Sequence, residues 1–295
     1  MSESNRANAD IKSMKLYHHV DRVLTELRQM GKEDEGPLSV DELTPFDQLH
    51  YHGTEAVDHA VRATGVSASS SVLEIGSGLG GPARHIAATV GAQVTALELQ
   101  SDQNQLASNL TARCGLTEKV THTCGDFLTY NWVGQHFDVI VSWLALYHIP
   151  ERDVLLKRCY GLLDQGGYLH AEDLYARVQF TDSERSELAT ELFANYLPDY
   201  ESYCRDLERA GFELVSCQEM SDEWTAFTRE RMAAFREQKS RHIDVHGEAV
   251  FASMDDFYDL VVRYFTAGKL GGIRFVARKV EGDLIMAVLK TTCSS

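Results

Sequence analysis

A group of glycines and carboxylates near residue 75 carries the clearest chemical signal in this sequence. Gly76, Ser77, Gly78 and Gly80 follow directly on the mostly apolar residues 72–75. Glycine adopts backbone conformations with positive φ, and it lets a ligand approach the main chain closely. The pattern predicts a strand and a ligand-binding turn, followed by a helix whose N-terminal amides face the ligand.

Three carboxylates occupy the ends of the first three predicted strands, at Glu74, Glu98 and Asp126. Glu98 is placed to accept hydrogen bonds from both hydroxyls of a ribose. Asp126 is placed to accept one from an exocyclic amine such as that of adenine. Glu74 would repel a pyrophosphate and attract a cation. The glycine spacing also matches a dinucleotide motif, but the carboxylates favour S-adenosylmethionine over NAD.

Four neighbouring residues extend this predicted nucleoside site. Leu99 follows Glu98 and is expected to pack on the adenine, with Phe127 on the adenine side next to Asp126. Gln103, one helical turn further on, is either a second ribose ligand or a solvated helix residue. Ser142 ends a later strand, and such strand ends form the lip of a ligand crevice in open α/β sheets.

The elements that must position these residues alternate between strands and helices. This alternation predicts an α/β fold with a doubly wound, mostly parallel sheet and helices on both faces. The predicted strands are 72–75, 93–98, 119–124, 137–142 and 167–172, and the predicted helices between and after them are 82–90, 102–114 and 152–163.

The chain is expected to divide into four parts. Residues 1–53 form a helix over 10–30, an irregular linker over 31–43 and a segment that covers the active site. Residues 54–174 are the cofactor-binding core, which starts with a helix over 54–64 capped by Thr54. Residues 175–270 are a helical cap with one core strand at 211–220. Residues 271–295 form a hairpin with strands 273–280 and 283–290 around Glu281–Gly282, which gives the sheet an antiparallel C-terminal edge.

These motifs together resemble the class I S-adenosylmethionine-dependent methyltransferases over residues 54–172. The resemblance rests on E-x-G-x-G-x-G-G, the strand ending at Glu98, the GDF at residues 125–127 and the strand HFDVIVSW. Within that superfamily the chain is similar to small-molecule enzymes that include sarcosine/dimethylglycine and phosphoethanolamine N-methyltransferases. The supporting segments are FDQLHYHG at 46–53, LYHIP at 146–150 and AGKLGGIRFVARK at 267–279.

The resemblance implies roles for residues that the glycine motif does not reach. His148 is implied as a base or orienting group for the methyl acceptor; the alternative is a histidine that caps the next helix. Tyr51, His52 and Gln48 belong to the segment that folds over the cofactor, and Tyr51 is a second candidate for proton transfer.

Other residues are candidate contacts for the acceptor. Trp143 and Tyr147 follow the fourth strand, and Tyr196 and Tyr200 occur with Tyr203 at helical spacing. Those three tyrosines are either core residues or an aromatic wall that holds a methylated ammonium by cation–π attraction.

One arginine in the C-terminal segment is a candidate anion ligand. Arg274 follows a glycine pair. It is either a partner for a substrate carboxylate or phosphate, or an arginine at the surface edge of a strand.

Composition excludes several classes of partner. The chain has 28 basic and 44 acidic residues, so its formal charge is −16, which argues against nucleic acid or an anionic membrane as a main partner. No stretch is long and apolar enough to span a bilayer, and the N-terminus lacks a secretory signal. Six cysteines without metal spacing indicate reduced thiols, a cytoplasmic location and no metal site. The sequence leaves a homodimer open.

These observations predict an enzyme that transfers a methyl group from S-adenosylmethionine to the nitrogen of a small amine or amino acid. The acceptor is expected to be of the sarcosine or dimethylglycine kind, which gives a betaine. The alternatives are O- or S-methylation, phosphoethanolamine methylation, an NAD-dependent oxidoreductase, and a cofactor-binding protein without catalytic activity.

Overall fold

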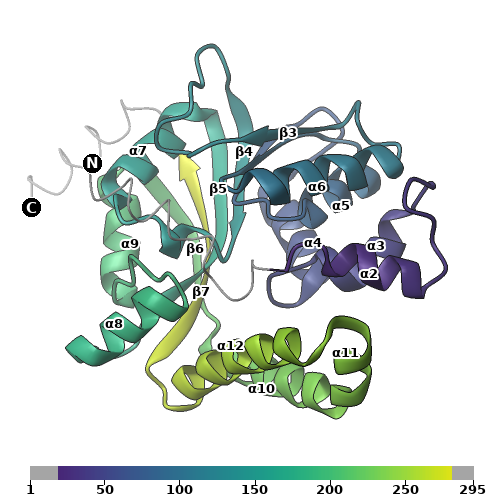
Figure 1. Ribbon diagram of the computed structural model, residues 1–295. Helices are drawn as coiled ribbons and strands as arrows, with labels where there is room; N and C mark the ends of the chain where they lie inside the picture. Colours follow the sequence, from purple (N-terminus) through teal and green to yellow (C-terminus); the bar gives the residue numbers. More distant parts are fainter. Residues whose placement is uncertain (1–18, 281–295) are drawn as a thin grey trace, which may run out of the picture.

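The computed structural model describes residues 19–280, which fold around one seven-stranded sheet (Figure 1). The strands are β1 (Ser71–Ile75), β2 (Gln93–Glu98), β3 (Val120–Cys124), β4 (Phe137–Trp143), β5 (Leu163–Ala176), β6 (Phe212–Glu219) and β7 (Leu270–Lys279). Their spatial order is β3-β2-β1-β4-β5-β7-β6. Strands β1 to β5 pair in parallel, and β7 runs antiparallel to both β5 and β6. The predicted mostly parallel sheet with an antiparallel edge is confirmed.

The helices lie on both sides of this sheet and across the ends of its strands. They are α2 (Arg22–Gln29), α3 (Val40–Asp47), α4 (Gly53–Thr64), α5 (Gly81–Val90), α6 (Ser101–Arg113), the 3-10 helix η2 (Leu146–His148), α7 (Arg152–Leu162), α8 (Asp182–Glu191), α9 (Tyr200–Arg209), α10 (Ser221–Glu237), α11 (Lys239–His246) and α12 (Glu248–Thr266). No helix within residues 19–280 has the length and apolar character needed to cross a membrane.

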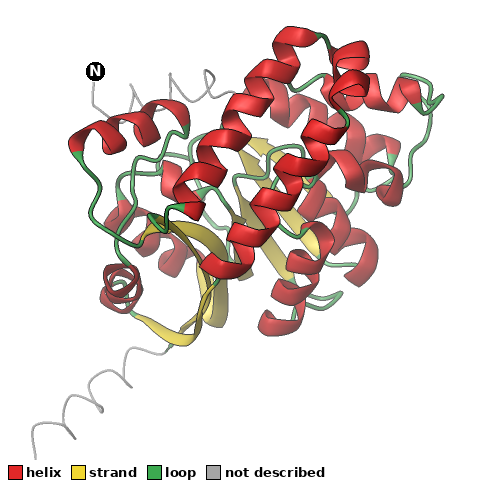
Figure 2. Ribbon diagram, turned by 90° about the horizontal axis from the view of Figure 1, so that it is seen from below, coloured by secondary structure: helices red, strands yellow, loops and turns green. Residues whose placement is uncertain are grey.

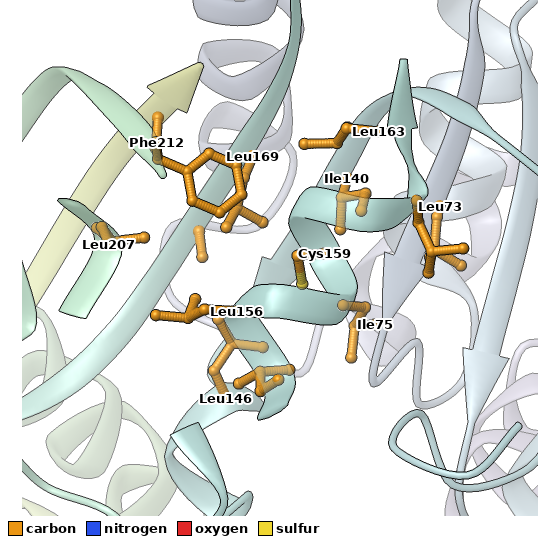
Figure 3. Close-up of a cluster of buried hydrophobic side chains, with 14 of the residues drawn as sticks. Leu73, Ile75, Ile140, Leu146, Leu156, Cys159, Leu163, Leu169, Leu207 and Phe212 are labelled. Carbon is orange, nitrogen blue, oxygen red and sulfur yellow. The ribbon is translucent and has the colours of Figure 1, made fainter. Parts of the chain in front are cut away.

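Alternate residues of each strand supply the two cores. Leu73 and Ile75 of β1 point to the face covered by α7, where they meet Cys159 (Figure 3). Val72 of the same strand points to the opposite face and packs with Ile86 of α5. This period of two is the ordinary geometry of a strand buried on both sides. It fixes which strand-end residues reach each side of the sheet.

A helical cap of α10, α11 and α12 lies across one end of the sheet (Figures 1 and 2). The glycine pair in β7 explains how closely it packs. A Cβ on Gly271 would lie 2.4 Å from the Tyr175 ring, and one on Gly272 would lie 2.1 Å from the Trp224 ring. Because glycine has no Cβ, Trp224 of α10 packs directly against β7, fully buried.

The N-terminal region is more helical than predicted. The proposed helix over 10–30 is described only from residue 19, and α2 covers Arg22–Gln29. The interpretation of 31–43 as an irregular linker is wrong at its end, because Ser39 and Glu42 form a capping box that starts α3 at Val40. A box of this kind satisfies two backbone donors at a helix start.

Other predicted boundaries also change. Helix α4 begins at Gly53, after His52 in the left-handed region, so Thr54 is inside the helix and not its cap. Strand β5 extends to Ala176, beyond the predicted core boundary at residue 174. The second strand of the proposed hairpin, 283–290, and the turn at Glu281–Gly282 lie outside the described residues. The division into four parts stays a prediction.

Candidate active site

One cavity lies at the carboxyl ends of β1, β2 and β4, under the helical cap. Most of the residues predicted to bind the cofactor line it: Glu74, Gly76, Ser77, Gly78, Glu98, Leu99, Asp126 and Phe127. Residues from the N-terminal segment, from the loop after β4 and from the cap complete the wall. The cavity is therefore the place where the glycine turn and the predicted acceptor residues meet.

The glycine turn is tied to the neighbouring strand through its backbone. The amides of Gly76 and Ser77 both donate to the carbonyl of Leu97, each at 2.9 Å. Gly76 has φ +74°, and a Cβ there would lie 2.4 Å from the Cβ of Ala145 in the loop after β4. Only glycine adopts this conformation in this space without strain.

Two backbone amides fix the Glu98 carboxylate at the cavity wall. The amide of Gly78 donates to Oε2 and the amide of Gln100 donates to Oε1, each at 2.8 Å. These two bonds fix the orientation of the carboxylate at the end of β2, where a ribose ligand is expected. Asp126 is held in a similar way, since its Oδ1 accepts from the amide of Leu128 at 2.9 Å.

Glu74 is the third carboxylate of the cavity, and its surroundings favour a positively charged ligand. Burial is the main cause that raises the pKa of Glu74 to about 8, against the lowering effect of Arg84 and with a smaller raising contribution from the charge of Glu98. Its Oε2 is buried without a hydrogen-bond partner among the described residues. An ammonium or sulfonium group in the cavity would stabilise the ionised form. The donor set therefore fits S-adenosylmethionine.

Two residues predicted to bind the cofactor lie outside the cavity lining. The Ser142 hydroxyl is fully buried and donates to the carbonyl of Ile75 at 2.9 Å, so it joins β4 to β1. Gln103 is buried on the other side of the glycine turn, where its Oε1 lies 3.5 Å from the position of a Cβ on Gly78. Neither residue lines the cavity.

His148 faces the cavity from η2, directly after β4. Its Nδ1 lies 2.9 Å from the carbonyl oxygen of Phe193. Because a carbonyl only accepts, Nδ1 carries the proton and the lone pair of the neutral ring is on Nε2. Burial lowers the pKa of His148 to about 4, so the ring is neutral at pH 7.

Aromatic rings form much of the acceptor side of the cavity. Tyr51, Trp143, Tyr147 and Phe257 all line it. The Tyr147 ring lies 4.0 Å from the His148 ring between centroids. Burial raises the pKa of the Tyr51 hydroxyl above its usual value, so this tyrosine stays protonated at neutral pH.

The prediction that Tyr196 and Tyr200 form an aromatic wall for the acceptor is wrong, because neither residue lines this cavity. Tyr196 lies in the loop before α9 and donates to Oδ2 of Asp206 at 2.6 Å. Tyr200 starts α9 and donates to the carbonyl of Cys217 at 3.2 Å. Tyr196 contacts helix α9 and Tyr200 contacts strand β6, so their regular spacing does not place the two rings in one wall.

Two further predicted substrate residues have partners elsewhere in the fold. Nε of Arg274 forms an ion pair with Oε1 of Glu172 at 2.6 Å across β7 and β5, so it is not placed to bind a substrate anion. Nε2 of His52 lies 3.1 Å from Oε1 of Glu223 on α10. Neither residue lines the cavity, and both connect elements of the fold.

Sequence reasoning missed several polar residues of the site, among them Arg231 and Asn195. Arg231 of α10 is the single guanidinium among the described residues that line this cavity. Asn195 lines it too, and its side-chain amide donates to the carbonyl of His148 at 2.9 Å, which supports η2. Neither residue lies in a recognisable motif. In the sequence, an arginine in a charged helix cannot be distinguished from a solvent-exposed one.

A family model described as a methyltransferase domain matches residues 72–167. A phosphoethanolamine N-methyltransferase from Plasmodium falciparum is 24% identical over 245 residues, which are 82% of this chain and 91% of that protein. A glycine/sarcosine/dimethylglycine N-methyltransferase from Actinopolyspora halophila is 25% identical over 61% of this chain and 32% of its own length. Methyltransferase GfsG from Streptomyces halstedii is 26% identical over 60% of this chain.

The chain spans 65% of the length of the Streptomyces protein and about a third of the Actinopolyspora protein. Among solved structures, phosphoethanolamine N-methyltransferase 2 from Haemonchus contortus superposes with a TM-score of 0.76 at 16% identity, over 95% of this chain and 61% of that one. The cyclopropane synthase MmaA2 from Mycobacterium tuberculosis gives 0.73 at 18% identity, over 92% and 98%.

These structural likenesses establish the Rossmann-like fold of the sheet and its surrounding helices. The matched domain spans the glycine turn and β1 to β4, which are the elements that build the cofactor side of the cavity. The geometry of the cavity, the methyltransferase domain match at residues 72–167 and the methyltransferase relatives agree, and together they support methyl transfer that depends on S-adenosylmethionine.

Proposed function

We propose that this enzyme methylates the nitrogen of a small amine that carries a carboxylate, of the sarcosine and dimethylglycine kind. The observation that carries the proposal is the composition of the acceptor side of the cavity. The lining holds the neutral His148, several aromatic rings and one arginine, together with the three carboxylates placed for the cofactor. Two further carboxylates, Asp47 and Glu151, also belong to the lining. This set suits an acceptor with a nitrogen at one end and an anion at the other.

When bound, the cofactor supplies an electrophilic methyl group. The residues of this chain hold the reactants and exclude water. Glu98 and Asp126 are placed for the ribose and the adenine amine, with their carboxylates fixed by backbone amides. Glu74 is placed for a positive charge. Positioning of this kind accounts for a large part of the rate enhancement in reactions between two bound partners.

His148 is the residue placed to manage the acceptor's proton. An amine at neutral pH is an ammonium and must lose a proton before its lone pair reacts. The carbonyl of Phe193 fixes the ring so that Nε2 carries the lone pair. Because the pKa of His148 is about 4, the ring accepts a proton only in passing. It therefore orients the amine through Nε2 and holds the amine's proton transiently while the lone pair reacts.

Arg231 is the residue placed to recognise the acceptor's anion. Its guanidinium lines the cavity and lies over the ring of Tyr258 at 5.2 Å, which restricts its orientation. A guanidinium matches a carboxylate with two parallel hydrogen bonds. The aromatic walls suit the methylated ammonium at the other end of the acceptor, through cation–π attraction of about 0.5–2 kcal/mol for each ring.

Phosphoethanolamine methylation is the second candidate. It is favoured by the Plasmodium relative, which this chain matches over 91% of that protein's length. A doubly charged phosphate usually gathers more than one cation, and Arg231 is the one arginine among the described lining residues. Because the cavity offers one arginine, we rank an acceptor with a carboxylate above an acceptor with a phosphate.

The test is methyl transfer from labelled S-adenosylmethionine to a panel of sarcosine, dimethylglycine, phosphoethanolamine and the neutral amine dimethylethanolamine. We expect label in the two amino acids and little in the neutral amine. Label in phosphoethanolamine alone would replace the first candidate by the second. Label in none of the amines, with S-adenosylhomocysteine still bound, would overturn N-methylation.

A further inference from the structure

A second cavity of about 560 Å³ lies between the N-terminal helices and the cap. Helix α2 packs against α11 at this place (Figure 1). Its lining holds three arginines, Arg22, Arg231 and Arg241, and two histidines of α11, His242 and His246. A positive cavity is unexpected in a chain whose formal charge is −16.

The one carboxylate among the described lining residues is already engaged. Oε1 of Glu26 accepts from Arg241 at 3.1 Å, and Nε2 of His246 lies 2.7 Å from the same oxygen. Arg241 also donates to Oε2 of Glu26. These contacts hold the pKa of Glu26 below its usual value even though burial acts in the opposite direction. Glu26 is therefore in direct contact with Arg241, and it forms no ion pair with the other two guanidinium groups.

Arg22 and Arg231 face the same space without a carboxylate partner within residues 19–280. Nε of Arg22 donates to the carbonyl of His19 at 3.3 Å. Burial lowers the pKa of Arg22, and the like charge of Arg231 lowers it too, partly offset by Tyr258 and Glu26. Two guanidinium groups held near each other attract an anion that would neutralise both.

A metal ion is the competing occupant, because Glu26, His242 and His246 place one ligand atom each within 4.8 Å of one another. Histidines four residues apart on one helix commonly chelate zinc. Here the carboxylate is shared with Arg241, and further guanidinium groups surround it. This concentration of positive charge opposes a divalent cation and favours an anion.

We propose that this second cavity binds a phosphate group between Arg22 and Arg231, with His242 at its side. The ligand is either free phosphate or a small phosphomonoester. The planar guanidinium groups of two arginines can each donate two parallel hydrogen bonds to the oxygens of a phosphate, which a lysine ammonium cannot do. This site goes beyond the proposed function, and it shares Arg231 with the active-site cavity.

Arg231 lines both cavities, so the phosphate site has a route to the active site. A phosphate that holds this guanidinium in the second cavity would leave it less able to bind the acceptor's carboxylate. We therefore expect phosphate to raise the KM for the acceptor and to leave binding of S-adenosylhomocysteine unchanged.

The experiment is calorimetric titration of inorganic phosphate and of glycerol 3-phosphate, each against sodium chloride at equal ionic strength. The key variant is Arg22→Gln. Its matched control on the same helix is Arg28→Gln, because Arg28 is exposed and pairs with Asp34. We expect the wild type and the control to bind, and Arg22→Gln to bind about tenfold or more weakly, as the loss of a charged hydrogen-bond donor predicts. Tighter binding of glycerol 3-phosphate would identify a phosphomonoester site, and equal binding would identify a site for the phosphate group alone.

The same titrations contain the outcomes that overturn the proposal. No phosphate binding beyond the chloride blank, or equal binding by Arg22→Gln, would do so. Zinc binding that is lost in His242→Gln, without phosphate binding, would replace the anion by a metal. S-adenosylhomocysteine is titrated into every variant, because unchanged affinity shows that the chain is folded. It also separates failure here from failure of the methyltransferase chemistry. If Arg22→Gln does not fold, Arg22→Lys keeps the charge, loses the fork and is expected to bind phosphate more weakly.

Discussion

The two sides of the active-site cavity are built in different ways. The cofactor side comes mainly from one continuous stretch, the glycine turn and Glu98, and backbone amides hold its groups in place. The acceptor side is assembled from Tyr51, His148 and Arg231, which are far apart in the chain. The first depends on main-chain geometry and the second on tertiary packing. Substitutions on the two sides should therefore separate cofactor binding from turnover.

The largest effect is expected on the acceptor side, at His148. In His148→Gln the proton-accepting ring nitrogen is lost, and kcat should fall by about 10²–10⁴-fold while the affinity for S-adenosylhomocysteine stays the same. His136→Gln, at an exposed position, is the matched control. Because burial lowers the pKa of His148 to about 4, protonation of this ring should not reduce the wild-type kcat between about pH 8 and about pH 6. A full loss of cofactor binding in His148→Gln would contradict the assignment of this residue to the acceptor side of the cavity.

The next effect is expected at the glycine turn. Gly76→Ala puts a Cβ 2.4 Å from that of Ala145 at φ +74°, so stability should fall by about 1–3 kcal/mol from overpacking. Activity should fall by about a hundredfold because the turn moves. Gly115→Ala is the control, since φ is +67° there but no atom lies within 4 Å of the new Cβ. Thermal unfolding measures the stability of each variant, and initial rates measure its activity. Equal losses in the two variants would mean that backbone strain, and not the contact with Ala145, is responsible.

Glu98 offers a way to weaken the cofactor side without moving its backbone. In Glu98→Gln one backbone amide, of Gly78 or Gln100, would face an NH₂ group in place of an oxygen. Leaving a buried donor unpaired costs about 1–3 kcal/mol, which is about tenfold to a hundredfold in affinity for S-adenosylhomocysteine. Glu118→Gln, at an exposed position, should bind as the wild type does. Unchanged calorimetric affinity in Glu98→Gln would remove this residue from the cofactor site.

A smaller effect, tied to pH, is expected at Glu74. Burial raises its pKa to about 8 in the free protein, so the carboxyl is mostly protonated at pH 7. A cationic ligand favours the ionised form, and binding should release a proton. The affinity for S-adenosylhomocysteine, which carries an ammonium, should then rise with pH by at most about tenfold per unit up to about pH 8. Calorimetry in buffers of different ionisation enthalpy measures the number of protons released on binding. The pH dependence should disappear in Glu74→Gln, and its persistence there would assign it to another group.

The same comparison explains how much could be predicted from the sequence. Gly76, Glu98 and Asp126 lie in a local pattern of strand, turn and strand, so their positions follow from short-range geometry. His148 was predicted through a short motif that resembles a family. Arg231 was not predicted, because its position depends on how α10 packs across the sheet.

Tertiary packing also explains the predictions that were corrected. Arg274 was assigned to the substrate, but the register of β5 and β7 places it opposite Glu172. Tyr196 and Tyr200 were grouped by their spacing, although Tyr196 lies in a loop and Tyr200 is the first residue of α9. Local spacing cannot distinguish a ring that lines a cavity from one that packs against the sheet. The cytoplasmic location and the homodimer stay predictions.

The most direct test of the account is the KM for dimethylglycine in Arg231→Gln, measured beside the affinity of the same protein for S-adenosylhomocysteine. Arg229→Gln, at an exposed position on the same helix, is the control. The account predicts a KM about tenfold or more above the wild-type value, from loss of a charged hydrogen bond, with the cofactor affinity unchanged. An unchanged KM, or no transfer to dimethylglycine by the wild type, would contradict the proposed recognition of the acceptor's carboxylate.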